Sequence, residues 1–292
     1  MKKLFVVVDM FKGLSKTQKS KINRISPLFS ELTFIINAYN PYFERYYFYY
    51  DEDFKSVRDD YSNQINKVKK QICSYFDEVK TETTILECYK KDLVSFLGPK
   101  IEGYETSWIL ITMPELTNRH TIHLEILRTI TCPIIMLTRK GWSKKILITA
   151  AIDPVHHNDT DFHVDSLIVS KANQFKKFFD AKLNVVHSCF APRMIQEHNL
   201  RINKIHNSAI EQFIQKGQTT ELQVEIINGN PEESLVKHVD SGGTDLLVMG
   251  SRSRDNSNKW FVGSTAESML KQMPCDILFI NVNLSSENKQ AN

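Results

Sequence analysis

The sequence lacks any long uncharged hydrophobic segment. A helix that crosses a bilayer needs about 18 to 20 mostly apolar residues, and no stretch of the 292 residues approaches that length. The apolar run Leu4–Val8 ends at Asp9 after five residues, which is too short for the hydrophobic region of a secretory signal. We therefore predict a cytoplasmic protein that is neither exported nor inserted in a membrane.

Cysteine is scarce and widely spaced. The chain has five cysteines and no Cys-x-x-Cys pair: Cys73, Cys88, Cys132, Cys189 and Cys275. This spacing argues against a disulfide framework and against a structural zinc site. It fits a reducing compartment.

The chain also has little excess charge of either sign. Lys and Arg number 37 against 34 Asp and Glu, and the net charge is +3. A surplus this small predicts no direct nucleic-acid binding, and such a partner would need a local patch of positive charge. The 41% of hydrophobic residues and 24% of charged residues indicate a globular protein rather than a disordered one.

Sequence motifs of known catalytic sites are missing. There is no Gly-x-Ser-x-Gly elbow and no His-Glu-x-x-His motif. The cluster His156, His157, Asp159, Asp161 and His163 matches no metal-ligand spacing. We expect no catalytic residues, no bound metal cluster and no enzyme beyond weak ATP hydrolysis.

The sequence does contain an internal repeat. The basic and apolar run Lys2–Asp9 recurs as Lys144–Asp153, and Ile130–Leu137 recurs as Met273–Ile280. Such self-similarity indicates two copies of one structural unit. We predict a first domain at 1–141, a second at 142–284 and a polar tail at 285–292.

Within the second copy, short runs rich in Val, Ile and Leu alternate with longer amphipathic stretches. Such alternation is typical of an α/β fold with a doubly wound parallel sheet. We predict two tandem five-stranded sheets with strand order 3-2-1-4-5. The expected strands are 145–152, 183–189, 222–228, 245–249 and 276–282, and the expected helices are 162–180, 198–216, 231–240 and 264–272. In the first copy, helices are expected at 17–31, 57–80, 90–98 and 121–129.

A ligand site is expected where the strand order reverses, between the first and fourth strands. Asp153 ends strand one of the second copy and Gly250 ends strand four. A polar loop with Arg252 and Ser253 then leads to a helix start. This chemistry suits phosphate, because glycines permit close approach and helix N-termini attract anions. The residues at the helix start are Gly263, Ser264 and Thr265.

A simpler interpretation of the same residues stays open. Ser264-x-x-Glu267 reads as a capping box, in which Ser264 is the N-cap, and the two glycines then only satisfy turns. Similarly, Ser241–Asp245 looks like a phosphate loop of adenylating enzymes, but it follows a predicted helix and reads better as a helix C-cap.

The pattern Gly250-x2-Ser253-x9-Gly263-Ser264 resembles the nucleotide motif of the universal stress protein family, Gly-x2-Gly-x9-Gly-Ser/Thr. The turn Gly229-Asn230-Pro231 is similar to the family's Gly-x-Pro turn. The duplicated arrangement resembles the tandem E type. The resemblance implies an adenine nucleotide alpha hydrolase-like fold, a stress role and ATP or another adenine nucleotide, with magnesium, bound in the second domain. It implies that Asp153 contacts the adenine or ribose side and that the loop and helix-start residues hold the phosphates.

The two copies depart from this pattern to different degrees. Ser253 replaces the second glycine of the motif, whereas in the first copy Met113 stands where Gly250 would be and six loop residues are missing. We therefore expect no phosphate site in the first copy and interpret Asp9 as a turn residue. A protein partner or homodimer is an open expectation.

The alternative to nucleotide binding is a scaffold or a carrier of apolar ligands. It is motivated by the degenerate first site and by the aromatic run Tyr42–Tyr50. That run fits packing between elements or an apolar cavity.

Overall fold

The computed structural model describes residues 2–39, 55–76, 81–101, 106–113, 120–155, 159–191, 193–217, 222–251 and 262–281. The predicted polar tail and the aromatic run Tyr42–Tyr50 lie outside these ranges. The chain divides into two compact units, one of residues 1–126 and 132–140 and the other of residues 127–131 and 141–292. No helix in the described ranges combines the length and hydropathy of a membrane span.

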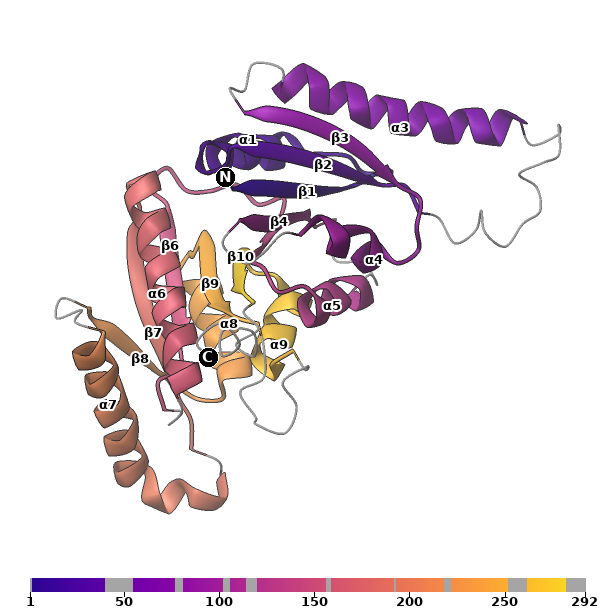
Figure 1. The fold of residues 1–292 in the computed structure, drawn as a ribbon. Coiled ribbons are helices and arrows are strands. Elements are labelled where there is room, and N and C mark those ends of the chain that lie inside the picture. The colour runs from indigo at the N-terminus through magenta and orange to yellow at the C-terminus, as the bar shows by residue number, and fades with distance from the viewer. Residues whose placement is uncertain are drawn as a thin grey trace, which may run out of the picture. The chain divides into compact units, whose positions relative to one another are not determined.

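The described strands of the first unit pair in parallel in the order β3-β2-β1-β4-β5. This is the predicted 3-2-1-4-5 order. Helices α1 and α3 lie on one side of these strands and α4 lies on the other (Figure 1). The strands are β1 (Lys3–Asp9), β2 (Glu31–Asn37), β3 (Glu82–Cys88), β4 (Ser107–Thr112) and β5 (Ile134–Leu137), and the helices are α1 (Lys16–Ile25), α3 (Lys55–Phe76), α4 (Leu93–Leu97) and α5 (His120–Thr129).

The predicted helix at 17–31 is too long. Helix α1 ends at Ile25 and a 3-10 turn over Ser26–Leu28 follows, with Pro27 in its first positions. Proline lacks an N–H and disfavours helical backbone at the residue before it. The chain therefore leaves the α-helix early, and β2 begins at Glu31.

The second unit has the same strand order. Its described strands pair in parallel as β10-β9-β6-β7-β8, which confirms the predicted doubly wound α/β fold. The strands are β6 (Leu147–Ile152), β7 (Lys182–Cys189), β8 (Val224–Asn228), β9 (Leu246–Gly250) and β10 (Asp276–Ile280), and the helices are α6 (Asp159–Phe179), α7 (Asn199–Lys216), α8 (Pro231–Ser241) and α9 (Ser264–Gln272).

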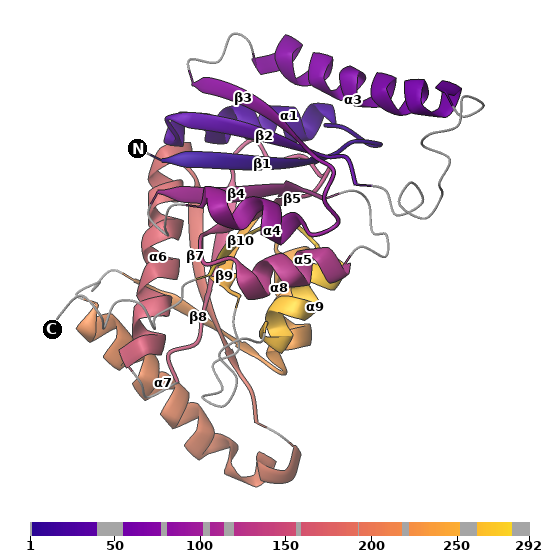
Figure 2. The same ribbon diagram turned by 45° about the vertical axis from the view of Figure 1, so that its right-hand side comes forward.

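Helices cover both faces of this sheet. Helix α6 packs on β6 and β9 and contacts α7 through the rings of Phe162 and Phe213, whose centroids are 5.5 Å apart. Helices α8 and α9 pack against each other on the opposite face (Figure 2). The central strands are buried on both sides, as a run of Val, Ile and Leu predicts: Ile148, Leu247, Val248, Ile277 and Leu278 are all enclosed.

Two turns of the second unit follow the sequence predictions. Gly242 is the C-cap of α8 and Gly243 has a φ of +67°, so this segment ends a helix rather than opening one. Gly229 has a φ of +119°, and the Asn230 side chain accepts a hydrogen bond from the Glu232 N–H at the start of α8. Gly229 and Gly243 therefore occupy backbone conformations that other residues rarely adopt.

Asp245 anchors the entry to β6. Its buried carboxylate accepts hydrogen bonds from the Ser143 N–H at 2.8 Å, the Ser143 hydroxyl at 3.1 Å and the Leu147 N–H at 2.9 Å. One side chain thus satisfies two backbone donors that lie about 100 residues earlier in the chain, which aligns the first strand with the fourth.

Replacing this carboxylate should destabilise the second unit. In Asp245→Ala, two backbone N–H groups lose their acceptor, and we expect the free energy of unfolding to fall by about 1–3 kcal/mol. Urea denaturation followed by circular dichroism measures the change. The matched control is Asp240→Ala, which removes an exposed carboxylate from α8 and should leave the free energy within about 0.5 kcal/mol. Equal losses in both variants would contradict the anchoring role.

Candidate functional site

The strand order places two of the predicted site residues at the same end of the second sheet. Ala150 of β6 lies opposite Val248 of β9, and two further residues along each parallel strand lead to Ile152 and Gly250. Asp153 follows β6 directly, so Asp153 and Gly250 lie at the carboxyl ends of neighbouring strands. In a doubly wound sheet this is the point at which the connections diverge to opposite faces.

The start of α9 differs from the capping-box interpretation. The N-cap is Gly263, with φ −64° and ψ 145°, and Ser264 is the first helical residue. No described side chain caps this end of the helix. Glu267, the acidic member of the expected box, instead places its carboxylate 2.8 Å from Lys271 Nζ. The backbone N–H groups of Ser264 and Thr265 therefore stand at a helix N-terminus that suits an anion.

Ser251 links this helix start to the ends of two strands. Its N–H donates to the Ile280 carbonyl at 3.4 Å, and its carbonyl accepts from the Gly263 N–H at 3.0 Å. The residue is 1% exposed, and its hydroxyl oxygen has no hydrogen-bond partner among the described residues. A buried hydroxyl in this state is costly unless a further group bonds to it.

Sequence reasoning did not select Ser251. The signal that could have identified it is its place directly after Gly250, inside the glycine pattern but at one of its unspecified positions.

Gly250 itself is not required by its local backbone or by crowding from the described residues. A Cβ atom built there would lie 3.6 Å from Val164 Cγ1 and 3.9 Å from Ile168 Cδ1, which are ordinary contacts. Its φ is outside the left-handed range. A need for glycine at this position would therefore come from a ligand that approaches the backbone.

Asp153 lies beside a pair of histidines that sequence reasoning missed. Its side chain is 44% exposed, and Oδ1 lies 3.8 Å from Nδ1 of the buried His187 in β7. His187 Nδ1 is also 3.2 Å from the Ile152 carbonyl oxygen, and its Nε2 is 2.6 Å from His206 Nδ1 in α7. The signal in the sequence was an ionisable residue, His187, within the strand predicted at 183–189.

The surroundings of His206 favour its neutral form. Partial burial lowers its pKa, the neighbouring His187 lowers it further, and the Asp153 carboxylate opposes both effects. If His187 Nδ1 donates to the Ile152 carbonyl, its Nε2 accepts, and His206 then donates from Nδ1. This chain of contacts connects the surface of α7 to the end of β6.

No cluster of at least three His, Cys, Asp or Glu side chains that could hold a metal ion occurs within the described ranges. Of the predicted loop cluster, His156 and His157 lie outside the described residues. The same is true of two predicted site residues, Arg252 and Ser253. Of the others, Ser264 is exposed and Thr265 is half-buried at the start of α9.

Comparison with known proteins locates a family match in the second unit. Residues 170–281 match the model of the Universal stress protein family. A curated relative, a putative universal stress protein of Staphylococcus haemolyticus, is 20% identical over 131 residues, which are 44% of this chain and 72% of the relative. These findings support a relationship between this chain and the universal stress protein family.

Solved structures show the fold of the whole chain. A putative universal stress protein from Pseudomonas aeruginosa matches 96% of this chain and 93% of its own with a TM-score of 0.69 and 15% identity. A universal stress protein from Archaeoglobus fulgidus matches 96% and 98% of the two chains with a TM-score of 0.59 and 13% identity. The cytoplasmic domain of a prokaryotic cation chloride cotransporter matches 95% and 94% with a TM-score of 0.55 and 13% identity. The fold therefore does not fix the function.

The strand register of the first unit aligns with that of the second unit one residue away from our expectation. Leu137 and Ile280 correspond in the repeat, and they pair with Thr112 and Gly250 respectively. Thr112, not Met113, thus occupies the position of Gly250, and Met113 corresponds to Ser251. The intervening segment is five residues shorter in the first unit rather than six, because these pairs are 25 and 30 residues apart.

The strand ends of the first unit are filled by its own side chains. The Thr112 hydroxyl donates to the Val7 carbonyl at 3.0 Å. Buried Gln18, which forms a capping box with Ser15 in α1, donates from Nε2 to the carbonyls of Met113 at 3.2 Å and Leu137 at 3.3 Å. These bonds satisfy the two carbonyls of the first unit that correspond to those of Ser251 and Ile280 in the second unit.

Asp9 ends β1 as a turn residue, as predicted. Its Oδ1 accepts from the N–H groups of Phe11 at 2.9 Å and Lys12 at 3.1 Å, and its carbonyl accepts from the Gly13 N–H at 2.8 Å. Gly13 has a φ of +55°, so the turn depends on a glycine. Asp9 and Asp153 occupy equivalent positions but have different partners.

The histidine pair predicts a pH dependence of stability. Because the folded protein lowers the pKa of His206, the unfolded chain, with a pKa near 6.5, takes up the proton first as the pH falls. Stability is therefore highest above pH 6.5 and decreases below it. His206→Gln should make the free energy of unfolding less dependent on pH in this window. Urea denaturation at a series of pH values measures the slope.

The control for this experiment is His198→Gln, which removes an exposed imidazole from the turn before α7. A slope that is reduced equally by both substitutions would contradict a specific role of the pair.

Proposed function

We propose that this chain is a tandem universal stress protein that binds ATP or a related adenine nucleotide in its second unit only. The observation that carries the proposal is the start of α9. A helix N-terminus without a described side-chain cap lies beside Gly250 and the unpartnered buried hydroxyl of Ser251. Backbone N–H groups, a hydroxyl and the positive end of a helix dipole are suited to a phosphate.

In this proposal, each predicted residue has a distinct role. Gly250 lets a phosphate approach the backbone, and the N–H groups and hydroxyls of Ser264 and Thr265 donate to its oxygens. Arg252 supplies positive charge and Ser253 contributes its N–H. Asp153, at the end of β6, contacts the ribose or adenine side. When bound, magnesium would neutralise phosphate charge that these donors leave unpaired.

Restriction of binding to one unit is supported by Gln18. Its amide occupies the carbonyls at the ends of β4 and β5, while the equivalent carbonyl of Ser251 in the second unit accepts from Gly263, the N-cap of α9. An anion that approached the corresponding strand ends of the first unit would meet the side chain of Thr112 at the position of Gly250.

We propose binding rather than efficient turnover as the mode of action. The first turn of α9 carries one acidic residue, Glu267, and its pairing with Lys271 leaves it poorly placed to activate a water molecule. The role that fits a universal stress protein is then a nucleotide-dependent binding protein in a cytoplasmic stress response.

A second candidate is a scaffold that binds a protein partner without nucleotide. It is favoured by apolar side chains at the start of α7 and just before it: Met194, in the turn before the helix, is 93% exposed, and Leu200, in its first turn, is also exposed. Exposed apolar side chains of this size are common at interaction sites of soluble proteins. Titration of the protein with ATP distinguishes the two candidates, because only the first requires nucleotide binding.

The decisive variant is Gly263→Asp. Asp is a favoured N-cap, and the backbone angles of Gly263 suit any residue, so α9 should keep its stability or gain a few tenths of a kcal/mol. The added carboxylate would repel phosphate, and we expect ATP affinity to fall about tenfold or more. Calorimetric titration with ATP and magnesium measures affinity, and thermal unfolding measures stability.

The matched control is Gly98→Asp in the first unit. A Cβ there meets no heavy atom within 4 Å, so the same charge is added at an open position and ATP affinity should not change. Native mass spectrometry should find one nucleotide per wild-type chain. The nucleotide proposal fails if ATP binds equally to Gly263→Asp and to the wild type, or if it does not bind to the wild type at millimolar concentration.

Ser251→Ala tests the buried hydroxyl. Since the hydroxyl has no described partner in the protein, its removal should leave the free energy of unfolding unchanged or slightly higher. If the hydroxyl bonds to a phosphate, ATP affinity should fall about threefold to tenfold, as expected for the loss of one hydrogen bond. If Ser251→Ala is stable and binds ATP with wild-type affinity, Ser251 is not part of the site. Ser253→Gly restores the second glycine of the motif and should instead increase ATP affinity.

A further inference from the structure

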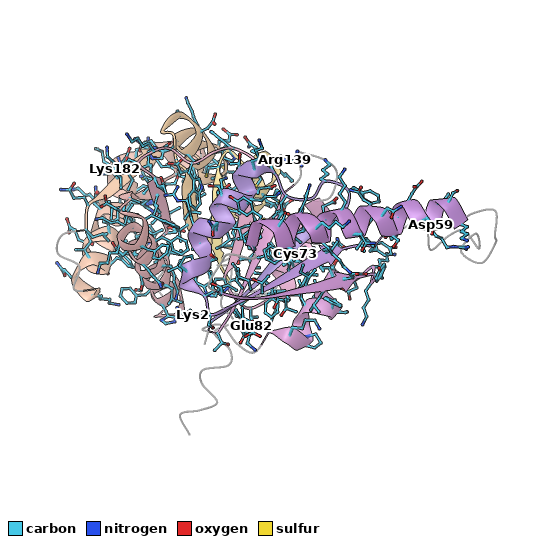
Figure 3. The ribbon with its side chains drawn as sticks, turned by 90° about the horizontal axis from the view of Figure 1, so that it is seen from above. Lys2, Asp59, Cys73, Glu82, Arg139 and Lys182 are labelled. Atoms are coloured by element: carbon cyan, nitrogen blue, oxygen red, sulfur yellow. The ribbon has the colours of Figure 1, made fainter. Side chains whose placement is uncertain are left out.

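The first unit has a strongly basic face. It is formed by α1, the turn before it and the second half of α3, and we call it the α1–α3 face. Figure 3 looks down on it, with Asp59 and Cys73 marking the two ends of α3. Its lysines are Lys12, Lys16, Lys19, Lys67 and Lys70.

Three contacts hold α1 and its preceding turn against α3. Gln64 Nε2 donates to the carbonyls of Met10 at 3.0 Å and Phe11 at 3.3 Å. A Cβ on Gly13 would lie 2.8 Å from Gln71 Oε1, so the Gln71 side chain packs closely against the Gly13 backbone. At the end of α3, Lys19 Nζ lies 5.4 Å from the centre of the Tyr75 ring. The basic residues of both helices therefore share one surface.

The helices that form this surface are much more positively charged than the chain as a whole. Helices α1 and α3 together carry nine basic and two acidic residues, whereas the entire protein has a net charge of +3. The two acidic residues, Asp59 and Asp60, both lie in the first turns of α3. The rest of α3 and all of α1 contain no acidic residue.

These lysines differ from others nearby that have internal roles. Lys69 pairs with Glu87 of β3, and buried Lys21 donates to the Thr138 carbonyl at 3.3 Å. By contrast, Lys12, Lys16, Lys67 and Lys70 are exposed. Exposed ammonium groups on one face concentrate a positive potential that attracts polyanions.

Aromatic rings are interspersed with this charge. Tyr75 is 41% exposed and lies under Lys19, while Phe11 is 49% exposed and adjoins Lys12. The Phe11 ring meets Tyr61 of α3 edge to face, with centroids 6.4 Å apart. Rings held on a rigid surface and bordered by cations are the feature that stacks unpaired bases.

We propose that the α1–α3 face binds single-stranded nucleic acid, with the lysines on phosphates and the rings of Tyr75 and Phe11 against bases. Flat exposed rings distinguish this partner from an acidic protein or an anionic bilayer, which would use the charge alone or would need deeper apolar side chains. The even charge of the whole sequence concealed this face, because the excess of basic residues is confined to α1 and α3 and is averaged out over the full chain. The proposal is independent of nucleotide binding in the second unit.

The test is fluorescence anisotropy with labelled oligo(U) and oligo(dT) of about 16 nucleotides, a length at the upper end of a single-strand site. We expect binding at about 50 mM salt that weakens roughly 100-fold at about 200 mM, since five phosphate contacts predict a log–log slope near −3.5. Lys67→Gln/Lys70→Gln should reduce the steepness of this slope by about 1.4.

Two further variants test the rings and the specificity of the face. Tyr75→Ala should weaken binding about fivefold or more at constant salt slope, and Tyr75→Phe, which keeps the ring, should not. The charge control is Lys204→Gln/Lys237→Gln, which removes two exposed lysines from α7 and α8 of the second unit and should leave affinity within about twofold.

Each opposing result overturns the proposal. No anisotropy change at low salt would do so, as would equal losses in the two double-lysine variants. Wild-type affinity in Tyr75→Ala would reduce the face to a nonspecific cation patch. Binding to phosphatidylserine vesicles without binding to either oligonucleotide would assign the face to a membrane instead.

Discussion

The backbone of Ser251 is the junction on which the candidate site depends. Its N–H bonds to the end of β10 and its carbonyl bonds to Gly263 at the start of α9. These two bonds fix a helix N-terminus at the carboxyl edge of the sheet, next to Gly250. Without them, the glycine pattern would be only a polar loop, because a phosphate site requires donors held in place rather than donors of the right type.

The two units show how one fold supports different chemistry at the same place. Both have the order 3-2-1-4-5, and both place an aspartate at the carboxyl end of the first strand. In the first unit, Gln18 and Thr112 satisfy the strand ends, and Asp9 bonds to its own turn. In the second unit, Gly250 stands at the position of Thr112, the Ser251 carbonyl accepts from the Gly263 N–H, and Asp153 lies beside His187. The same framework thus closes one site with internal hydrogen bonds and leaves donors at the other.

The exposed helices add a second contrast between the units. The first unit gathers lysines and two aromatic rings on α1, the turn before it and α3, whereas the second has exposed apolar residues before and within α7. Similar folds occur in universal stress proteins and in a transporter's cytoplasmic domain. Strand order alone therefore does not identify a partner within this architecture.

The sequence by itself determined the α/β fold, the strand order and most element bounds, because parallel strands buried on both faces leave uninterrupted apolar runs. The sequence-based prediction was wrong where a single residue sets a boundary or a register. Pro27 ends α1 earlier than predicted, and the strand pairing places Thr112 rather than Met113 opposite Leu137. Only the tertiary structure decided that Gly263 rather than Ser264 caps α9, that His187 meets His206, and that five lysines share one face. Such contacts join residues distant in the chain, and no local pattern of spacing or polarity encodes which of them will meet.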